Sequence, residues 1–196
     1  MEALLVSTGI VALAEIGDKT QLLSFVLAAR YRRPLPIIMG IFVATLLNHA
    51  MAGALGTWIM SLMSAQHLKW ALGISFIAMA GWALIPDQFE DDAAQTKYTG
   101  TSVFLATTLA FFLVEMGDKT QVATVVLAAR FGDFFAVVTG TTIGMLLANV
   151  PAVLFGGRIA DRLPVRTIQR AVAILFVVLG AWVILGDIKV AGARAS

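Results

Sequence analysis

The chain has 196 residues, of which 59% are hydrophobic and 13% are charged, and its mean hydropathy is +0.88. Because a soluble domain carries about 25% charged residues, this composition argues against a soluble protein and predicts an integral membrane protein. Cysteine is absent, which excludes disulfides and thiolate metal sites. The net charge of +2 comes without a basic run interleaved with aromatic residues, so no nucleic-acid partner is expected.

Six apolar stretches follow one another along the chain. Each is long enough for a hydrocarbon core of about 30 Å, which takes about 20 helical residues. The sequence therefore predicts an all-α integral membrane protein with six transmembrane helices, at residues 3–29, 35–60, 68–86, 101–129, 134–157 and 167–186.

The second half of the chain repeats the first. Residues 1–86 align with 101–186 without a gap, most densely at 15–30 against 115–130. Three spans in each repeat place the halves in opposite orientations, which is the inverted-repeat plan of many secondary transporters. The expected organisation is a first three-helix repeat at 1–86, an acidic connector at 87–100 and a second three-helix repeat at 101–196.

Basic residues are concentrated in the loops on one side of the predicted spans. Lysine and arginine favour the cytoplasmic side of a membrane, so this side is expected to be cytoplasmic, with both termini outside the inner (plasma) membrane. The basic residues on it are Arg30, Arg32, Arg33, Lys97, Arg158, Arg162, Arg166 and Arg170, against Lys69, Arg130, Lys189 and Arg194 on the other side.

One charged motif occurs in both halves, deep inside an apolar stretch. Its copies are Glu15-Ile16-Gly17-Asp18-Lys19-Thr20-Gln21 and Glu115-Met116-Gly117-Asp118-Lys119-Thr120-Gln121. Each charged side chain costs roughly 2.5–3.5 kcal/mol at the centre of a membrane helix, and two identical costly copies disfavour a purely structural charge network. Helical geometry predicts that the two acids, the lysine and Leu22 of the first copy share one helix face, as do their counterparts in the second.

Inverted symmetry is expected to bring both copies into one cavity near the membrane midplane. Carboxylate and amide oxygens match Ca²⁺, Mn²⁺ or Mg²⁺ rather than Zn²⁺ or Cu⁺. Thr20, Thr120, Gln21 and Gln121 either contribute ligands or bond to the backbone or a neighbouring helix. The predicted cation ligands are Glu15, Asp18, Gln21, Glu115, Asp118 and Gln121.

Two further features of the motif leave alternatives open. Gly17 and Gly117 either let another helix approach closely or allow the helix to loosen and expose carbonyl groups. Lys19 and Lys119 either pair with a carboxylate of the opposite copy or extend out of the cavity along their apolar stems. His49 lies in the middle of a predicted span, where it either relays protons or forms an ordinary hydrogen bond between helices.

The charge of the site suggests a mechanism. Four carboxylates and two ammonium groups leave a net charge of −2, which one divalent ion or two protons would neutralise. A cation/proton antiporter needs at least one site that can bind either the divalent ion or the protons. The alternatives are a passive divalent-cation channel, an exporter of small organic cations and a membrane-embedded hydrolase that uses its carboxylates to activate water.

The duplicated Glu-x-Gly-Asp-Lys-Thr motif, once in each half of a six-helix chain, resembles the GDT-type family of cation/proton antiporters. That family includes Golgi Ca²⁺/Mn²⁺ transporters of eukaryotes and small bacterial manganese exporters. The resemblance implies that Glu15, Asp18, Glu115 and Asp118 bind the cation and that the motif glycines serve packing. It favours Mn²⁺ export from the cytoplasm, with Ca²⁺ as the other candidate. The metal would be a substrate and no cofactor is expected; the partners are the cation, protons and lipid, and a homodimer is compatible with the sequence.

Overall fold

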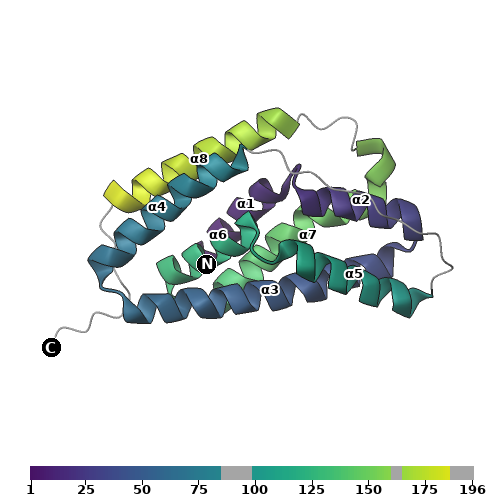
Figure 1. Cartoon of the computed structure of the whole chain (residues 1–196), viewed down its shortest axis with the longest axis horizontal. Coiled ribbons are helices and arrows are strands. Elements are labelled where there is room, and N and C mark those ends of the chain that lie inside the picture. The colour runs from purple at the N-terminus through teal and green to yellow at the C-terminus, as the bar shows by residue number, and fades with distance from the viewer. Residues whose placement is uncertain (85–98, 160–164, 186–196) are drawn as a thin grey trace.

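The computed structural model describes residues 1–84, 99–159 and 165–185, and within these ranges the chain is entirely helical (Figure 1). Residues 87–98 of the predicted acidic connector lie outside the described ranges, while Thr99 caps the following helix. The helices are α1 (Glu2–Glu15), α2 (Lys19–Tyr31), α3 (Pro34–Leu62), α4 (Ala65–Ala83), α5 (Gly100–Glu115), α6 (Lys119–Phe131), α7 (Phe134–Ile159) and α8 (Val165–Leu185).

The prediction of continuous helices at 3–29 and 101–129 is wrong, because both break inside the motif. Gly17 and Gly117 adopt positive φ angles of 80° and 74°, a conformation that glycine enters without the steric penalty of a Cβ atom. The axis bends by 70° between α5 and α6. Loosening of the helix, one of the two predicted roles for these glycines, is observed at both of them.

The two halves of the chain pack by the same rule. α1 packs against α7 as α5 packs against α3, and α2 contacts α7 as α6 contacts α3. Glycines 100 positions apart permit the first two contacts: a Cβ atom on Gly40 would lie 2.7 Å from Thr107 of α5, and one on Gly140 would lie 2.5 Å from the Leu4 carbonyl oxygen of α1. The repeat in the sequence is therefore also a repeat in helix packing.

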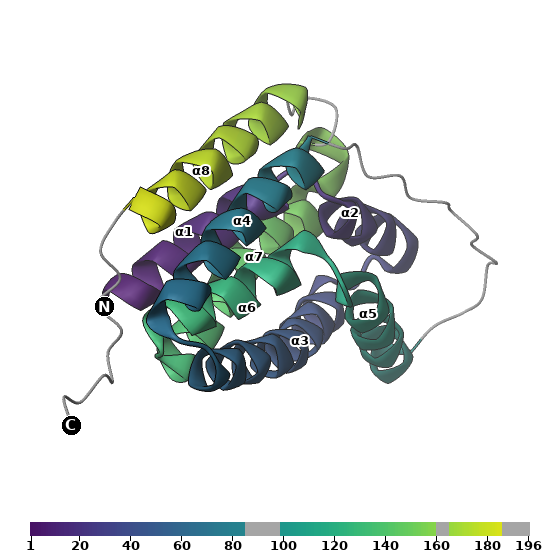
Figure 2. The same ribbon diagram turned by 60° about the vertical axis from the view of Figure 1, so that its left-hand side comes forward.

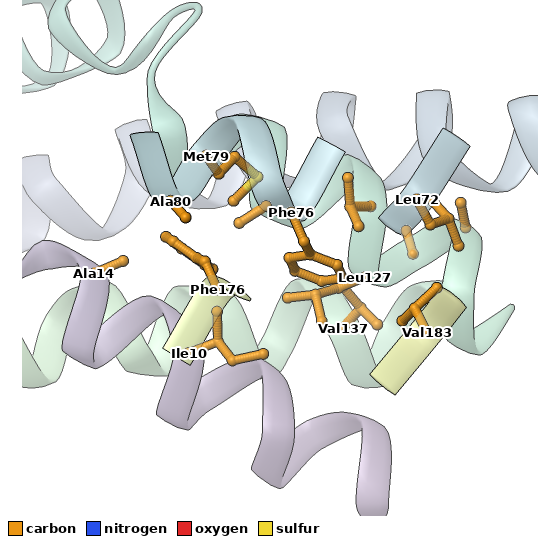
Figure 3. Close-up of a cluster of buried hydrophobic side chains, with 14 of the residues drawn as sticks. Ile10, Ala14, Leu72, Phe76, Met79, Ala80, Leu127, Val137, Phe176 and Val183 are labelled. Atoms are coloured by element: carbon orange, nitrogen blue, oxygen red, sulfur yellow. The ribbon is translucent and has the colours of Figure 1, made fainter. Parts of the chain in front are cut away.

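Helices α4 and α8 form a pair that packs over α1 and α6 (Figures 1 and 2). Repeat-equivalent aromatic rings meet in this layer, since Phe76 and Phe176 stack with their centroids 6.2 Å apart. Figure 3 shows them among Ile10, Leu127 and other buried apolar side chains. A second apolar cluster joins α2, α3, α5 and α7, so the broken turns of the motif link helices that belong to different clusters.

Two helices within the described ranges are long and apolar enough to cross a membrane, at Pro34–Leu62 and Phe134–Phe155. The bent pair α5 and α6 provides a third candidate span if it is counted as one. The structure therefore shows an all-helical protein with two or three candidate spans, and the full set of six stays a prediction.

Candidate functional site

The break in each motif places its two acids at opposing helix ends. Glu15 and Glu115 are the last residues of α1 and α5, while Asp18 and Asp118 are the N-caps of α2 and α6. At most 1% of each acid is exposed. The prediction that the acids and lysine of one copy share a helix face is wrong, because the first helix ends at the glutamate and a new one begins at the lysine.

The two motif copies contact each other through crossed ion pairs. Lys19 Nζ lies 2.7 Å from Asp118 Oδ1, and Lys119 Nζ lies 2.6 Å from Asp18 Oδ1. The prediction that each lysine pairs with a carboxylate of the opposite copy is therefore confirmed. The two motif copies, which are offset by 100 positions in the sequence, thus form one polar centre.

The two ion pairs differ in their access to solvent. The Lys19 side chain is 24% exposed, whereas the Lys119 side chain is 4% exposed. A cavity of about 290 Å³ adjoins the first motif copy, and it is lined by Ala12, Ile16, Gln21, Phe25, Leu147, Ala148, Pro151 and Ala152. The arrangement is therefore unequal on its two sides although its sequence is nearly symmetric.

The motif glutamines hold the broken turns together. Gln21 Oε1 accepts a hydrogen bond from the Gly17 backbone N–H at 2.8 Å, and Gln121 Oε1 accepts one from Gly117 at 2.7 Å. Such bonds satisfy N–H groups that a helix end leaves without partners. Cation ligation by the two glutamines stays a prediction, since in this structure their amide oxygens serve the backbone.

The motif threonines differ between the halves. The Thr120 hydroxyl donates a short hydrogen bond to Glu115 Oε1 and also lies 3.4 Å from Asp118 Oδ2. The Thr20 hydroxyl is buried and has no hydrogen-bond partner in the described part of the chain. A Cβ atom on Gly117 would meet no atom within 4 Å, so a packing role is wrong for this glycine, whose function is conformational.

Polar residues of α3 and α7 complete the centre. Asn149 Nδ2 donates to Glu15 Oε1 at 3.3 Å, and its Oδ1 accepts from the Ser24 hydroxyl at 2.6 Å. His49 Nε2 lies 4.0 Å from Glu115 Oε1. Sequence reasoning did not assign Asn149 to the site, although its position 100 residues after His49 was a usable signal.

The centre is rich in oxygen ligands, and its two lysines are paired with its two aspartates. Within the described residues, no three carboxylate or imidazole side chains are grouped so that they could hold one metal ion. A cation that bound here would have to compete with the ammonium groups for the aspartates. Joint binding by all four acids therefore stays a prediction.

Comparison with known proteins shows the family. The model of the family described as "Divalent cation/proton antiporter GDT1" matches residues 3–91 and, separately, residues 103–191. This is a family of transporters rather than enzymes, in which the metal is a transported substrate and not a cofactor.

Individual relatives agree with the family match. The chain is 50% identical over 181 residues to a Vibrio cholerae protein named "Putative manganese exporter". The aligned region covers 91% of this chain and 88% of that protein. It is 23% identical to the "Divalent cation/proton antiporter GDT1" of Saccharomyces cerevisiae, over 90% of this chain and 81% of the yeast protein. It is 24% identical to "GDT1-like protein 3" of rice, over 89% and 71% of the two chains. No solved structure matches. With the family model matching both halves, the chain belongs to the GDT1 family of divalent cation/proton antiporters.

Proposed function

We propose that the protein exports Mn²⁺ from the cytoplasm in exchange for protons, through a site built from both motif copies. The crossed pairs Lys19–Asp118 and Lys119–Asp18 carry the proposal. They join two buried copies of the motif that lie at breaks between helices. Broken helices that meet near the membrane midplane are the arrangement in which many secondary transporters bind their ions.

The charge of the site supports exchange rather than simple passage. Four carboxylates and two ammonium groups carry a net charge of −2, so one divalent cation or two protons restore neutrality. A cation that approaches Asp18 and Asp118 displaces the two ammonium groups, which return when the cation leaves. The expected stoichiometry is two protons for each divalent cation.

The repeated packing supports alternating access. We infer six spans in two inverted repeats, with both termini outside the inner membrane and the arginine-rich loops in the cytoplasm. The motif centre lies between α1, α2, α5 and α6, which contact α3 and α7 in the same way in both halves. Rocking of one set of helices against the other would open the centre to each side in turn.

The choice of Mn²⁺ rests on two supports. Oxygen ligands suit Mn²⁺, Ca²⁺ and Mg²⁺, and the relative with 50% identity is named as a manganese exporter. Ca²⁺ is the second candidate because the inventory of oxygen ligands does not discriminate against it.

The proposal is tested by uptake of Mn²⁺ and Ca²⁺ into proteoliposomes under an imposed pH gradient. Wild type is compared with Glu15→Gln and Glu115→Gln, and Glu2→Gln serves as the matched control because Glu2 is exposed at the start of α1. Wild type and the control should move Mn²⁺ against its gradient, and both site variants should stop. Flux that ignores the pH gradient would instead indicate a channel.

A further inference from the structure

Repeat-equivalent positions on α3 and α7 hold different side chains beside equivalent glutamates. His49 of α3 faces Glu115, and Asn149 of α7 faces Glu15. Each pair is related to the other by the 100-residue repeat. The acidic ligands of the two halves are therefore identical, whereas their neighbours differ in chemistry.

Asn149 is fully engaged by the protein. Its amide nitrogen donates to Glu15 Oε1 at 3.3 Å and to the Met145 carbonyl at 3.1 Å, and its oxygen accepts from Ser24 at 2.6 Å. Ser24 is replaced in the second repeat by Thr124, whose hydroxyl donates to the Thr120 carbonyl of its own helix. Within the described residues, His49 therefore lacks the kind of partner that Ser24 provides for Asn149.

His49 is buried without a hydrogen bond. Its exposed fraction is 0%, and neither ring nitrogen has a hydrogen-bond partner within the described residues. Glu115 Oε2 likewise has none. A structural histidine between helices would be expected to make at least one hydrogen bond, because a buried polar group without one is destabilising. No described residue forms the hydrogen bond that was predicted for an ordinary histidine between helices.

The spacing of His49 and Glu115 suits a shared metal ion. Nε2 and Oε1 are 4.0 Å apart, which is too long for a hydrogen bond. A metal ion that lies between the two atoms, at about 2.2 Å from each and slightly off the line that joins them, would span this distance. The nitrogen faces the acid across this gap and has no hydrogen-bond partner among the described residues.

We propose that His49 is a direct nitrogen ligand of the transported cation and that it selects transition-metal dications over Ca²⁺ and Mg²⁺. The inference rests on the proposed function, since it assigns a further ligand to the same site. Imidazole adds affinity for first-row transition metals, Mn²⁺ gaining the least of them, whereas Ca²⁺ and Mg²⁺ take oxygen ligands almost exclusively. The oxygen ligands of both motifs accept any of these ions, and the single imidazole distinguishes among them.

Selectivity is tested with His49→Asn, which installs the residue that the fold already accepts at the equivalent position 149. Transport of Mn²⁺ and Ca²⁺ is measured in proteoliposomes over a range of concentrations, with Glu115→Gln in parallel. His49→Asn should weaken the apparent affinity for Mn²⁺ by about 10-fold or more and change that for Ca²⁺ by less than about 2-fold. An equal loss for both ions, or no loss for either, would overturn the inference. Loss of transport in Glu115→Gln with unchanged selectivity in His49→Asn would overturn ligation by His49 and leave the proposed function intact.

A direct measurement on the wild-type protein needs no substitution in the site. The chain has two histidines, and the other one, His67, is exposed at the start of α4. Electron spin-echo spectra of Mn²⁺ bound to protein labelled with ¹⁵N-histidine should show a coupled nitrogen. The coupling should persist in His67→Gln. Its absence from wild type with bound Mn²⁺ would refute ligation by His49.

Discussion

The two crossed ion pairs should differ in their contribution to stability. Lys119 and Asp18 are both buried, with 4% and 0% of their side chains exposed, and their charged atoms are 2.6 Å apart. Removing one partner of a buried pair leaves an uncompensated charge and costs about 3–5 kcal/mol. At about 2–4 °C for each kcal/mol in a chain of this size, Lys119→Met should lower the midpoint of thermal unfolding by roughly 10 °C.

Lys19→Met is the matched comparison. Its partner distance is nearly the same, at 2.7 Å, but 24% of the Lys19 side chain is exposed. Both variants leave a buried aspartate behind, but the attraction between the partly exposed Lys19 and Asp118 is more strongly screened than that between Lys119 and Asp18. Removing Lys19 therefore takes away less stabilising energy, and we expect a loss of less than about half that of Lys119→Met.

The assay is thermal unfolding of purified protein in detergent, followed by the helical signal. The double variant Lys119→Met with Asp18→Asn removes both charges of the pair and should recover most of the lost stability, since no isolated charge stays buried. Equal losses for the two lysine variants would refute the argument from exposure. No recovery in the double variant would show that the pair is not the source of the loss.

Three further perturbations separate conformational, hydrogen-bonding and packing roles, all measured by the same unfolding assay. Gly117→Ala should destabilise the protein by about 1–2 kcal/mol because φ is positive there. Its control is Gly9→Ala in α1, where an added Cβ atom would meet nothing within 4 Å, and this change should be neutral or stabilising. Gln121→Leu should cost about 1 kcal/mol by removing the acceptor for a backbone N–H. Gln121→Glu keeps an acceptor oxygen and should lose less when it is compared with wild type below about pH 4, where the new carboxyl group is protonated; equal losses there would contradict the capping role. Gly40→Ala should force α3 away from α5, where its Cβ would lie 2.7 Å from a side-chain carbon, and Gly81→Ala, which meets open space, is its control. Similar midpoints for these two variants would argue against close packing at Gly40.

Periodicity and repetition in the sequence were sufficient for the coarse plan. The apolar stretches predicted helices and a membrane protein, and the 100-residue offset predicted equivalent roles for Lys19 and Lys119. The first prediction follows from the favourable transfer of apolar side chains from water into the membrane. The second follows from the repeat together with the cost of placing charges in an apolar setting. The crossed pairing was accessible for the same reason, because buried charges require partners of opposite sign.

The break inside each motif could not be decided from the sequence. Glycine permits both a helical and a left-handed conformation, and the choice depends on whether something stabilises the broken turn. Here the Gln21 and Gln121 side chains do so, by accepting the glycine N–H groups. In a continuous helix the same glycine N–H groups would donate to backbone carbonyl groups instead. Which of the two arrangements is more stable depends on how the surrounding helices pack.

The sequence by itself determined the helical membrane plan, the duplication and the identity of the charged residues, because these follow from hydropathy and from residue type. The tertiary structure alone decided which polar atoms meet. It placed Asn149 on Glu15 and His49 opposite Glu115, and it left Lys19 more exposed than Lys119. The difference between His49 and Asn149 is present in the sequence, but their contacts with the glutamates and the unequal exposure of the lysines depend on long-range packing of α3 and α7 against the broken helices.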